Sequence, residues 1–263
     1  MAENSKIAWT HHTFNPWIGC TKVSEGCTFC YAAAQDRHRK WTPEGWGSGK
    51  PRKRTSEANW KKPLAWNRKA EREGKRYCVF CASLADVFDN EVSQGWRDDL
   101  FARIRATPYL NWQLLTKRIG NVPDMLPDDW GDGYPNVWLG ITVVVQKEAD
   151  RDIPKLLRMP ARLRFLSCEP LLEPLHIKNI PDWVIVGGES GPNARGFDLH
   201  WAENIIEQCD AANVPVFVKQ IGAHPYTSPK HAGATGYFLS LKDKKGADLN
   251  EWPAHLRRQE VPG

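Results

Sequence analysis

The chain has 263 residues, of which 41% are apolar and 25% are charged, and its formal net charge is +5. This length suits one large domain or two small ones, and the apolar content is sufficient for a sizeable core. No apolar run approaches a membrane span, the first residues lack the features of a secretory signal, and seven clustered cysteines argue against a disulfide framework. We therefore expect a cytoplasmic protein without a membrane partner.

Three cysteines lie close together near the N-terminus: Cys20, Cys27 and Cys30, with the spacing C-x6-C-x2-C. They follow an apolar segment, Thr13–Ile18, that is predicted as the first strand, and they precede a helix predicted over Tyr31–Lys40. Soft thiolate ligands hold iron well, and three of them without a fourth suit an iron–sulfur cluster whose last iron is open to a small molecule. The sequence therefore predicts a reactive metal centre at this trio.

Two alternatives to a cluster remain open at the trio. A structural zinc site needs four ligands, and the fourth would be His11, His12 or His38. In the other alternative the three thiols bind no metal. The remaining cysteines are predicted to be small apolar residues of the core: Cys78, Cys81, Cys168 and Cys209.

A basic stretch begins within the first predicted helix and continues after it. Residues 37–76 contain fourteen Lys and Arg against four Asp and Glu, a local charge of +10. The stretch also holds four tryptophans: Trp41, Trp46, Trp60 and Trp66. Basic residues among flat aromatic rings suit phosphate contact and base stacking, so DNA or RNA is the expected partner of residues 37–76. The alternative is a solvated insertion at 41–76 whose tryptophans pack locally. Independently of this choice, the Gly-, Pro- and Lys/Arg-rich segment Thr42–Lys53 is predicted to be a mobile loop.

Apolar runs alternate with helical patterns after residue 76. Helices are predicted over Gln94–Ala106, Lys147–Arg158 and His200–Ala212, the last with an apolar face. Six further strands are predicted: Tyr77–Leu84, Trp112–Thr116, Val137–Val143, Leu163–Ser167, Trp183–Val186 and Val214–Val218. Such β/α units predict an α/β fold, a complete or partial (β/α) barrel of about six to seven parallel strands over 1–222, with an open doubly wound sheet as the alternative. Residues 223–263 are predicted to be an irregular or hairpin extension packed on the barrel.

Polar side chains follow several of the predicted strands, where a β/α barrel carries its working residues. The groups that we expect to do acid–base or binding chemistry are two carboxylates and two amines: Glu169, Glu189, Lys117 and Lys219. The alternative for each is a salt bridge at the rim. The Gly187-Gly188 pair lets the backbone approach a ligand closely, because glycine has no side chain.

The cysteine trio ahead of a helix in a β/α barrel resembles the radical S-adenosylmethionine (radical SAM) enzymes. Their usual motif is C-x3-C-x2-C with an aromatic residue between the last two cysteines, and Phe29 occupies that aromatic position here. The first gap differs, since six residues instead of three separate Cys20 from Cys27.

The chain as a whole more closely resembles the phage Gp37/Gp68-like family of unknown function (DUF5131). The matching segments are TFNPWIGC (13–20), LLTKR (114–118), WLG (138–140), SCEPLL (167–172), WVIVGGESG (183–191) and FVKQ (217–220). They cover most of residues 7–222. This resemblance implies relatives but no reaction.

The radical SAM resemblance implies a cofactor chemistry. Cys20, Cys27 and Cys30 would hold three irons of a 4Fe-4S cluster, and SAM would chelate the fourth. An electron donor would then drive SAM cleavage to methionine and a 5′-deoxyadenosyl radical, while the protein positions the cofactor. Ser83 and Asp86 would meet the methionine part of SAM. The other strand-end residues would bind SAM or substrate: Lys117, Thr142, Glu169, Gly187, Gly188, Glu189, Lys219 and Gln220.

The leading functional hypothesis is a radical SAM enzyme that modifies or repairs nucleic acid or a nucleotide-derived base. One alternative is a non-catalytic nucleic-acid-binding protein in which a metal shapes the N-terminal loop. The other is a metal-independent barrel enzyme with a Glu/Lys acid–base site. The sequence leaves the oligomeric state open.

Overall fold

The structure is a computed structural model that describes residues 3–229 and 236–263. The chain forms two compact units, the first made of Met1–Ile141 with Lys155–Arg164, and the second of Thr142–Pro154 with Phe165–Gly263. Within the described residues, no helix combines the length and the apolar character needed to cross a membrane.

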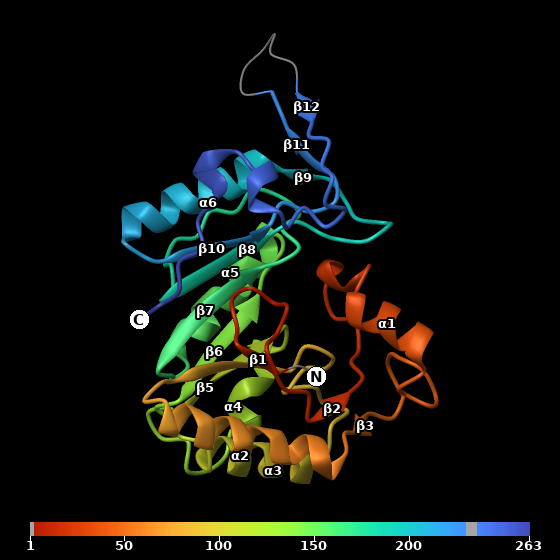
Figure 1. The fold of residues 1–263 in the computed structure, drawn as a ribbon, viewed down its shortest axis with the longest axis vertical. Helices are drawn as coiled ribbons and strands as arrows, with labels where there is room; N and C mark the ends of the chain where they lie inside the picture. The colour runs from red at the N-terminus through yellow and green to blue at the C-terminus, as the bar shows by residue number, and fades with distance from the viewer. Residues whose placement is uncertain (1–2, 230–235) are drawn as a thin grey trace. The chain divides into compact units, whose positions relative to one another are not determined.

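Unit 1 contains a parallel sheet in which the strands follow one another in chain order (Figure 1). β1 (His12–Thr13) pairs with β4 (Tyr77–Cys81), β4 with β5 (Leu110–Thr116), and β5 with β6 (Val137–Thr142). Every residue of β6 is buried, and β4 is buried from its second residue onward. Near-continuous apolar runs of this kind are typical of parallel strands, which are covered on both faces. The strands predicted from Tyr77, Trp112 and Val137 are thus confirmed with small shifts at their ends.

The predicted first strand, Thr13–Ile18, is wrong as one element. The segment forms two short strands, β1 in the sheet and β2 (Trp17–Ile18), which pairs antiparallel with β3 (Lys53–Arg54). Pro16 separates them and lacks the N–H group that a continuing ladder would need. The basic segment is therefore joined to the N-terminal segment by backbone pairing.

The helices of unit 1 are α1 (Tyr31–Arg39), α2 (Glu57–Arg72), α3 (Gln94–Arg105) and α4 (Val122–Met125), with 3-10 turns at Glu25–Cys27 and Ile119–Asn121. The helix α2 lies against β4 and β5 (Figure 1). It was not predicted, because its many lysines and an internal proline obscure its pattern. Its buried residues recur every three or four positions, the spacing of one helix face: Asn59, Trp60, Pro63, Trp66, Asn67 and Ala70.

Unit 2 contains most of β7 (Leu163–Cys168), from Phe165 onward, together with β8 (Trp183–Gly187) and β10 (Val216–Gln220), again paired in chain order. The helix α5 (Gln146–Arg158) begins in this unit, and α6 (Leu199–Ala212) packs against β8 and β10 (Figure 1). β10 begins two residues later than predicted, because Val214 N–H still bonds the helix carbonyl of Cys209 across the left-handed cap of α6.

Residues after 220 add a small sheet to unit 2. β11 (Pro225–Thr227) lies between β9 (Phe197–Asp198) and β12 (Tyr237–Phe238), pairing parallel with β9 and antiparallel with β12. Two 3-10 turns follow, Leu249–Glu251 and Ala254–Leu256. The last segment then pairs antiparallel with β10 through Phe217 and Gln259. Where they are described, the residues after 222 thus form short strands and 3-10 turns within unit 2.

The fold class is α/β, and the described residues contain seven strands of parallel main sheet. In each unit the successive strands are neighbours, as in a barrel or half-barrel, and unlike a doubly wound sheet, whose strand order reverses. The architecture is consistent with the predicted partial barrel of six to seven strands. A specific likeness to radical SAM enzymes stays a prediction.

Candidate functional site

The segment that carries the cysteine trio follows β2 in the sequence and is attached to the loop that follows β4. Gly19 N–H donates to the Leu84 carbonyl oxygen (3.1 Å), and Gly19 forms a parallel bridge with Ala85. At the other end of the segment, Tyr31 opens α1 and its hydroxyl donates to the Ser83 carbonyl oxygen (2.6 Å). Residues 20–30 are therefore held at both ends by the loop after β4, the position at which barrel enzymes carry their chemistry.

The three sulfurs have different surroundings. Cys20 Sγ lies 3.5 Å from Arg118 Nη1, Cys27 Sγ is 4.0 Å from Ser24 Oγ, and Cys30 packs against the apolar cluster that contains Ile18. All three cysteines are free and partly accessible. Three thiols in one short segment fit an iron–sulfur cluster chemically. Across the part of the chain that is described, however, no group of three or more His, Cys, Asp or Glu side chains is arranged to hold a metal ion.

The buried ion pair of Arg118 and Asp86 lies next to Cys20. Arg118 Nη1 donates to Asp86 Oδ2 (2.8 Å), and Nη2 donates to the Thr21 carbonyl oxygen (2.8 Å). The side chains of Arg118 and Asp86 are 9% and 6% exposed. Asp86 also accepts hydrogen bonds from the Thr116 hydroxyl (2.8 Å) and the Lys117 N–H (3.2 Å). The carboxylate therefore connects the ends of β4 and β5 to the cysteine segment, and a contact with SAM stays a prediction.

The thiol of Cys20 is held in its neutral form. Burial raises the pKa of Cys20 to about 12, and the nearby Asp86 carboxylate adds to the increase, while Arg118 opposes it. A metal ion at this sulfur would have to displace the proton, as metal binding to cysteine generally does.

Some of the cationic and aromatic residues of the basic segment are buried in unit 1, whereas most of its lysines and arginines are exposed. Arg52 is buried: its Nη2 lies 2.8 Å from Asp89 Oδ2 and 3.2 Å from Glu91 Oε2. Trp60 and Trp66 are each 3% exposed. Trp60 contacts Phe14 and Trp66 stacks on His12, so these two rings belong to the core of unit 1, and a nucleic-acid partner of residues 37–76 stays a prediction. Arg54 lies over the Trp60 ring at 4.1 Å and also pairs with Asp99.

Two of the three histidines proposed as zinc ligands, His11 and His12, are engaged in unit 1, while His38 is exposed on α1. His11 Nδ1 accepts a hydrogen bond from the Cys78 N–H (2.9 Å), and the His12 ring stacks on Trp66 with centroids 4.5 Å apart. Burial lowers the pKa of both imidazoles, that of His12 to about 4. Cys78 and Cys81 are buried in β4, which confirms their assignment to the core. The same holds for Cys168 and Cys209.

Unit 2 brings another set of predicted residues together. Lys219 Nζ lies 2.8 Å from Glu169 Oε1, and Ser167 Oγ donates to the second carboxylate oxygen of Glu169 (3.3 Å). A Cβ atom on Gly187 would approach Glu169 Oε1 to 3.2 Å. The carboxylate, the amine and the glycine all lie at the carboxyl ends of β7, β8 and β10. The predicted rim salt bridge is therefore present for Glu169 and Lys219, and an acid–base role for this pair stays a prediction.

The two neighbouring strand-end residues, Gly188 and Gln220, support this arrangement. Gln220 Nε2 donates to the Gly188 carbonyl oxygen (2.9 Å), and Gly188 N–H donates to the Gln220 carbonyl oxygen (3.0 Å). Glu189 does not join the cluster. It is 8% exposed and its carboxylate accepts two bonds from Arg195 at 2.9 Å. The ion pair between Glu189 and Arg195 thus joins the two ends of the loop 189–195.

The remaining predicted residues are placed as follows. Phe29 is 41% exposed beside the trio, and Thr142 is 5% exposed at the end of β6. Lys117 follows β5 with its backbone bonded to Asp86. The sequence prediction selected Lys117 and missed its neighbour Arg118, although both directly follow the same strand.

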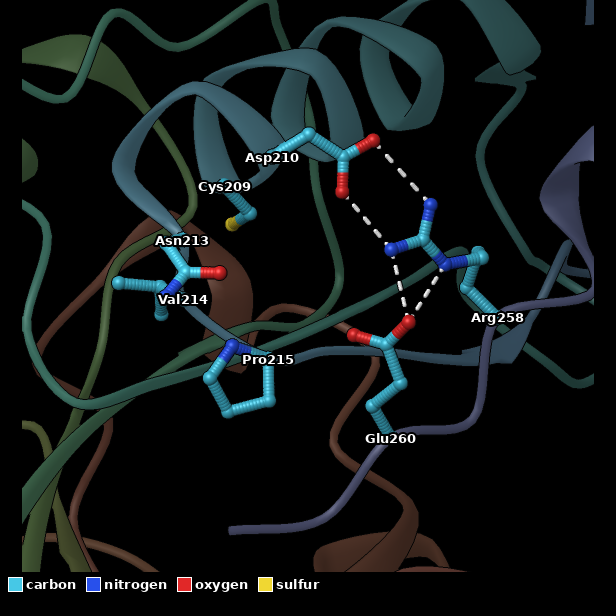
Figure 2. A pocket seen from close by; sticks show the side chains of 7 residues that line it. All are labelled: Cys209, Asp210, Asn213, Val214, Pro215, Arg258 and Glu260. Atoms are coloured by element: carbon cyan, nitrogen blue, oxygen red, sulfur yellow. Dashed lines mark hydrogen bonds and ion pairs between the residues drawn. The ribbon is translucent and has the colours of Figure 1, made fainter.

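A surface hollow of about 360 Å³ lies elsewhere in unit 2, at the end of α6 (Figure 2). Its lining includes none of the predicted site residues: Cys209, Asp210, Asn213, Val214, Pro215, Arg258 and Glu260. Arg258 bridges both carboxylates in it, at 2.8 Å from Asp210 Oδ1 and 2.7 Å from Glu260 Oε1 (Figure 2). The arginine and the two carboxylates of the hollow are thus paired with one another.

The fold and the strand-end clusters define an α/β protein built from parallel β/α units. A family model matches residues 4–252, and the chain belongs to that family, described as a protein of unknown function (DUF5131). The resemblance noted from the sequence segments is thus confirmed for this family. The comparisons with curated proteins and with solved structures found no match.

Proposed function

We propose that this protein is a radical SAM enzyme whose substrate is a nucleic acid or a nucleotide-derived base. The observation that carries the proposal is the position of the cysteine segment. Residues 20–30 start at the end of β4 and lead directly into α1, with Cys20 against the Arg118–Asp86 pair. Cys20, Cys27 and Cys30 would hold the cluster, which with SAM supplies a radical able to abstract hydrogen from a substrate.

The chain's own residues would prepare this site. Arg118 and Asp86 fix the first cysteine, while the Tyr31 hydroxyl and the start of α1 fix the last. In the middle of the segment, the Gly26 N–H donates to Ser24 Oγ and the Cys27 N–H donates to the Ser24 carbonyl oxygen, which forms a local turn. Iron binding would draw the three sulfurs together by rearranging this middle part, with the two ends in place.

Anaerobic reconstitution with iron and sulfide tests the proposal. We expect about four irons and four sulfides per chain, an iron–sulfur absorption band, and its change when SAM is added. The Cys27→Ala variant should lose the iron. The matched control Cys209→Ala, which removes a thiol from the core of unit 2, should retain it. A wild-type protein without bound iron after reconstitution would refute the proposal.

A second candidate function is favoured by the Glu169–Lys219 contact. In this candidate the protein is a metal-independent enzyme in which the pair performs acid–base chemistry at the ends of β7 and β10. It predicts that metal-free protein retains its activity on the substrate and that Glu169→Gln abolishes it. The Glu189→Gln variant serves as the control, because Glu189 is paired with Arg195 outside this cluster.

A further inference from the structure

The helix α2 carries a row of positive charge on its exposed side. Its buried face, which includes Trp60 and Trp66, packs against β4 and β5, so the opposite side of the helix is directed away from the sheet of unit 1 (Figure 1). Lys61, Arg68 and Arg72 lie on that opposite side, because they are separated by about two turns and then about one turn of helix. All three side chains are exposed.

Little in unit 1 neutralises this charge. The helix α2 contains five Lys and Arg against two glutamates, Glu57 and Glu71, which leaves a charge of +3. Among the residues that the structure describes, neither glutamate forms an ion pair, and the side chains of Lys61, Lys62 and Arg68 have neither an ion pair nor a hydrogen bond. The exposed side of α2 is therefore a cationic surface without internal compensation.

The spacing of the cations suits a row of anions. Arg68 and Arg72 are four residues apart, and like charges at this spacing on a helix repel one another. An anion bound between them would remove that repulsion. The row from Lys61 to Arg72 spans about 16 Å of helix axis, and one strand of a duplex carries a phosphate every 3.4 Å or so. The row is thus long enough to lie along several successive phosphates.

The exposed side of α2 offers charge and no exposed ring or apolar face. The aromatic residues of the helix, Trp60 and Trp66, are each 3% exposed, so no ring is available for stacking on the bases of a single strand. Helices that lie in a membrane interface insert an apolar face, and that of α2 is already buried against the sheet. A duplex requires neither feature, because it presents its phosphates outward at about one charge per 1.7 Å of axis. These observations favour a double strand over a single strand and over a membrane.

We infer that the exposed side of α2, with Lys61, Arg68 and Arg72 at its centre, binds the phosphate backbone of a double-stranded nucleic acid. Such a contact is electrostatic and independent of base sequence. It narrows the nucleic-acid contact predicted for residues 37–76 to one helix and to one kind of interaction. The inference rests on the proposed nucleic-acid substrate, and it does not depend on the cluster.

Fluorescence anisotropy with a labelled DNA duplex tests the inference on the full chain at several salt concentrations. We expect the triple variant Lys61→Gln, Arg68→Gln and Arg72→Gln to raise Kd about tenfold or more at low salt, because up to three phosphate contacts are lost. The slope of log K against log salt should become shallower by about 2 to 3. Duplexes of unrelated sequence should bind alike, and a single strand should bind more weakly.

Two controls separate this surface from net charge and from folding. Replacing Lys242, Lys244 and Lys245 by Gln removes the same charge from exposed positions of unit 2, and this variant should bind with the wild-type Kd and slope. The double variant Arg68→Lys with Arg72→Lys keeps the charge of α2 and should retain the wild-type slope. All of these variants should unfold in urea as wild type does, because the replaced side chains are exposed.

Each of the following results would overturn the inference. If the α2 triple variant binds the duplex as wild type does, or if the unit 2 control weakens binding equally, the duplex does not bind through α2 and the proposed substrate class survives. If a single strand binds more tightly than the duplex, the contact is not with a duplex backbone. If wild type binds no nucleic acid, the proposed nucleic-acid substrate fails as well, whatever the iron content. If wild type sediments with phosphatidylserine vesicles through these cations and leaves the duplex free, the surface is one for membranes.

Discussion

Arg118 donates to the sulfur of Cys20 at 3.5 Å across 98 positions of the chain. The same guanidinium nitrogen donates to Asp86 at 2.8 Å, so one planar group fixes both the start of the cysteine segment and the loop after β4. A guanidinium suits this role better than an ammonium, because its donors form a rigid fork that serves several acceptors at once.

Replacing Arg118 should destabilise the protein and release the cysteine segment. Arg118→Met leaves Asp86 buried without its partner, which we expect to lower the free energy of unfolding by about 3–5 kcal/mol. Trypsin should then cleave faster after Lys22, which is exposed in that segment. Urea unfolding and limited proteolysis measure the two effects. As a control, Arg105→Met breaks an exposed pair with Asp129 and should cost no more than about 1 kcal/mol.

Arg52 and Lys53 should respond differently to neutralisation, although they are neighbours in the basic segment. Arg52 pairs with Asp89 and donates to the carbonyl oxygens of Gly47 and Lys50, all at 2.8 or 2.9 Å. Arg52→Gln should therefore lower the free energy of unfolding by about 3–5 kcal/mol. Lys53→Gln, at an exposed side chain, should change it by less than about 0.5 kcal/mol. Equal stability of the two variants in urea would contradict the burial of Arg52.

Adding one methyl group at Gly188 should disturb unit 2. The Cβ atom would lie 2.9 Å from Gly222 Cα and 2.9 Å from the Phe197 ring, and the first of these neighbours is backbone. We expect Gly188→Ala to lower the free energy of unfolding by about 1–3 kcal/mol. Gly95→Ala, in the helix α3 with no neighbour within 4 Å, should instead leave stability unchanged or raise it. Thermal unfolding of the two variants checks the difference.

His12 should make stability depend on pH in the acidic range. Its pKa is lowered to about 4 by burial, whereas an unfolded chain binds the proton near 6.5. The stabilisation is therefore present above pH 6.5 and is lost as pH falls towards 4, because only the unfolded state gains the proton in that window. The loss should reach about 3 kcal/mol near pH 4.

The variant His12→Phe isolates this effect, since it keeps a ring against Trp66 and cannot be protonated. Urea unfolding at several pH values should show a smaller loss of stability for the variant than for wild type below pH 6.5. Parallel pH profiles for the two proteins would contradict the neutral, buried state of His12.

The sequence was sufficient for most of the main sheet because parallel strands are buried on both faces and appear as short apolar runs. The sequence was insufficient for α2, where polar residues and a proline contribute to the buried face. In α2 the lysines occupy the exposed positions between Trp60 and Trp66, and Pro63 lies inside the helix, so propensity alone argues against it. The prediction of Thr13–Ile18 as a single strand failed for a local reason, because Pro16 lacks an N–H group.

The sequence indicated where in the fold candidate site residues lie, but it did not indicate which side chains pair with one another. The strand ends predicted from the sequence include Asp86 in unit 1 and the Glu169–Lys219 pair in unit 2, and their roles stay predictions. The pairing of Arg118 with Asp86, or of Arg52 with Asp89, connects distant parts of the chain and leaves no local spacing to recognise. Adjacent residues after a strand also point in different directions, so Lys117 and Arg118 were equally plausible from sequence.

Residues 258–260 pair with the edge strand β10 of unit 2. Val218 N–H donates to the Arg258 carbonyl (2.7 Å) and Glu260 N–H donates to the Val216 carbonyl (3.1 Å), so these residues occupy the outer edge of β10. An apolar strand with free N–H and C=O groups would otherwise be a template for another copy of the chain. Shortening the protein before Arg258 would uncover that edge, and aggregation during heating would be the first sign of its loss.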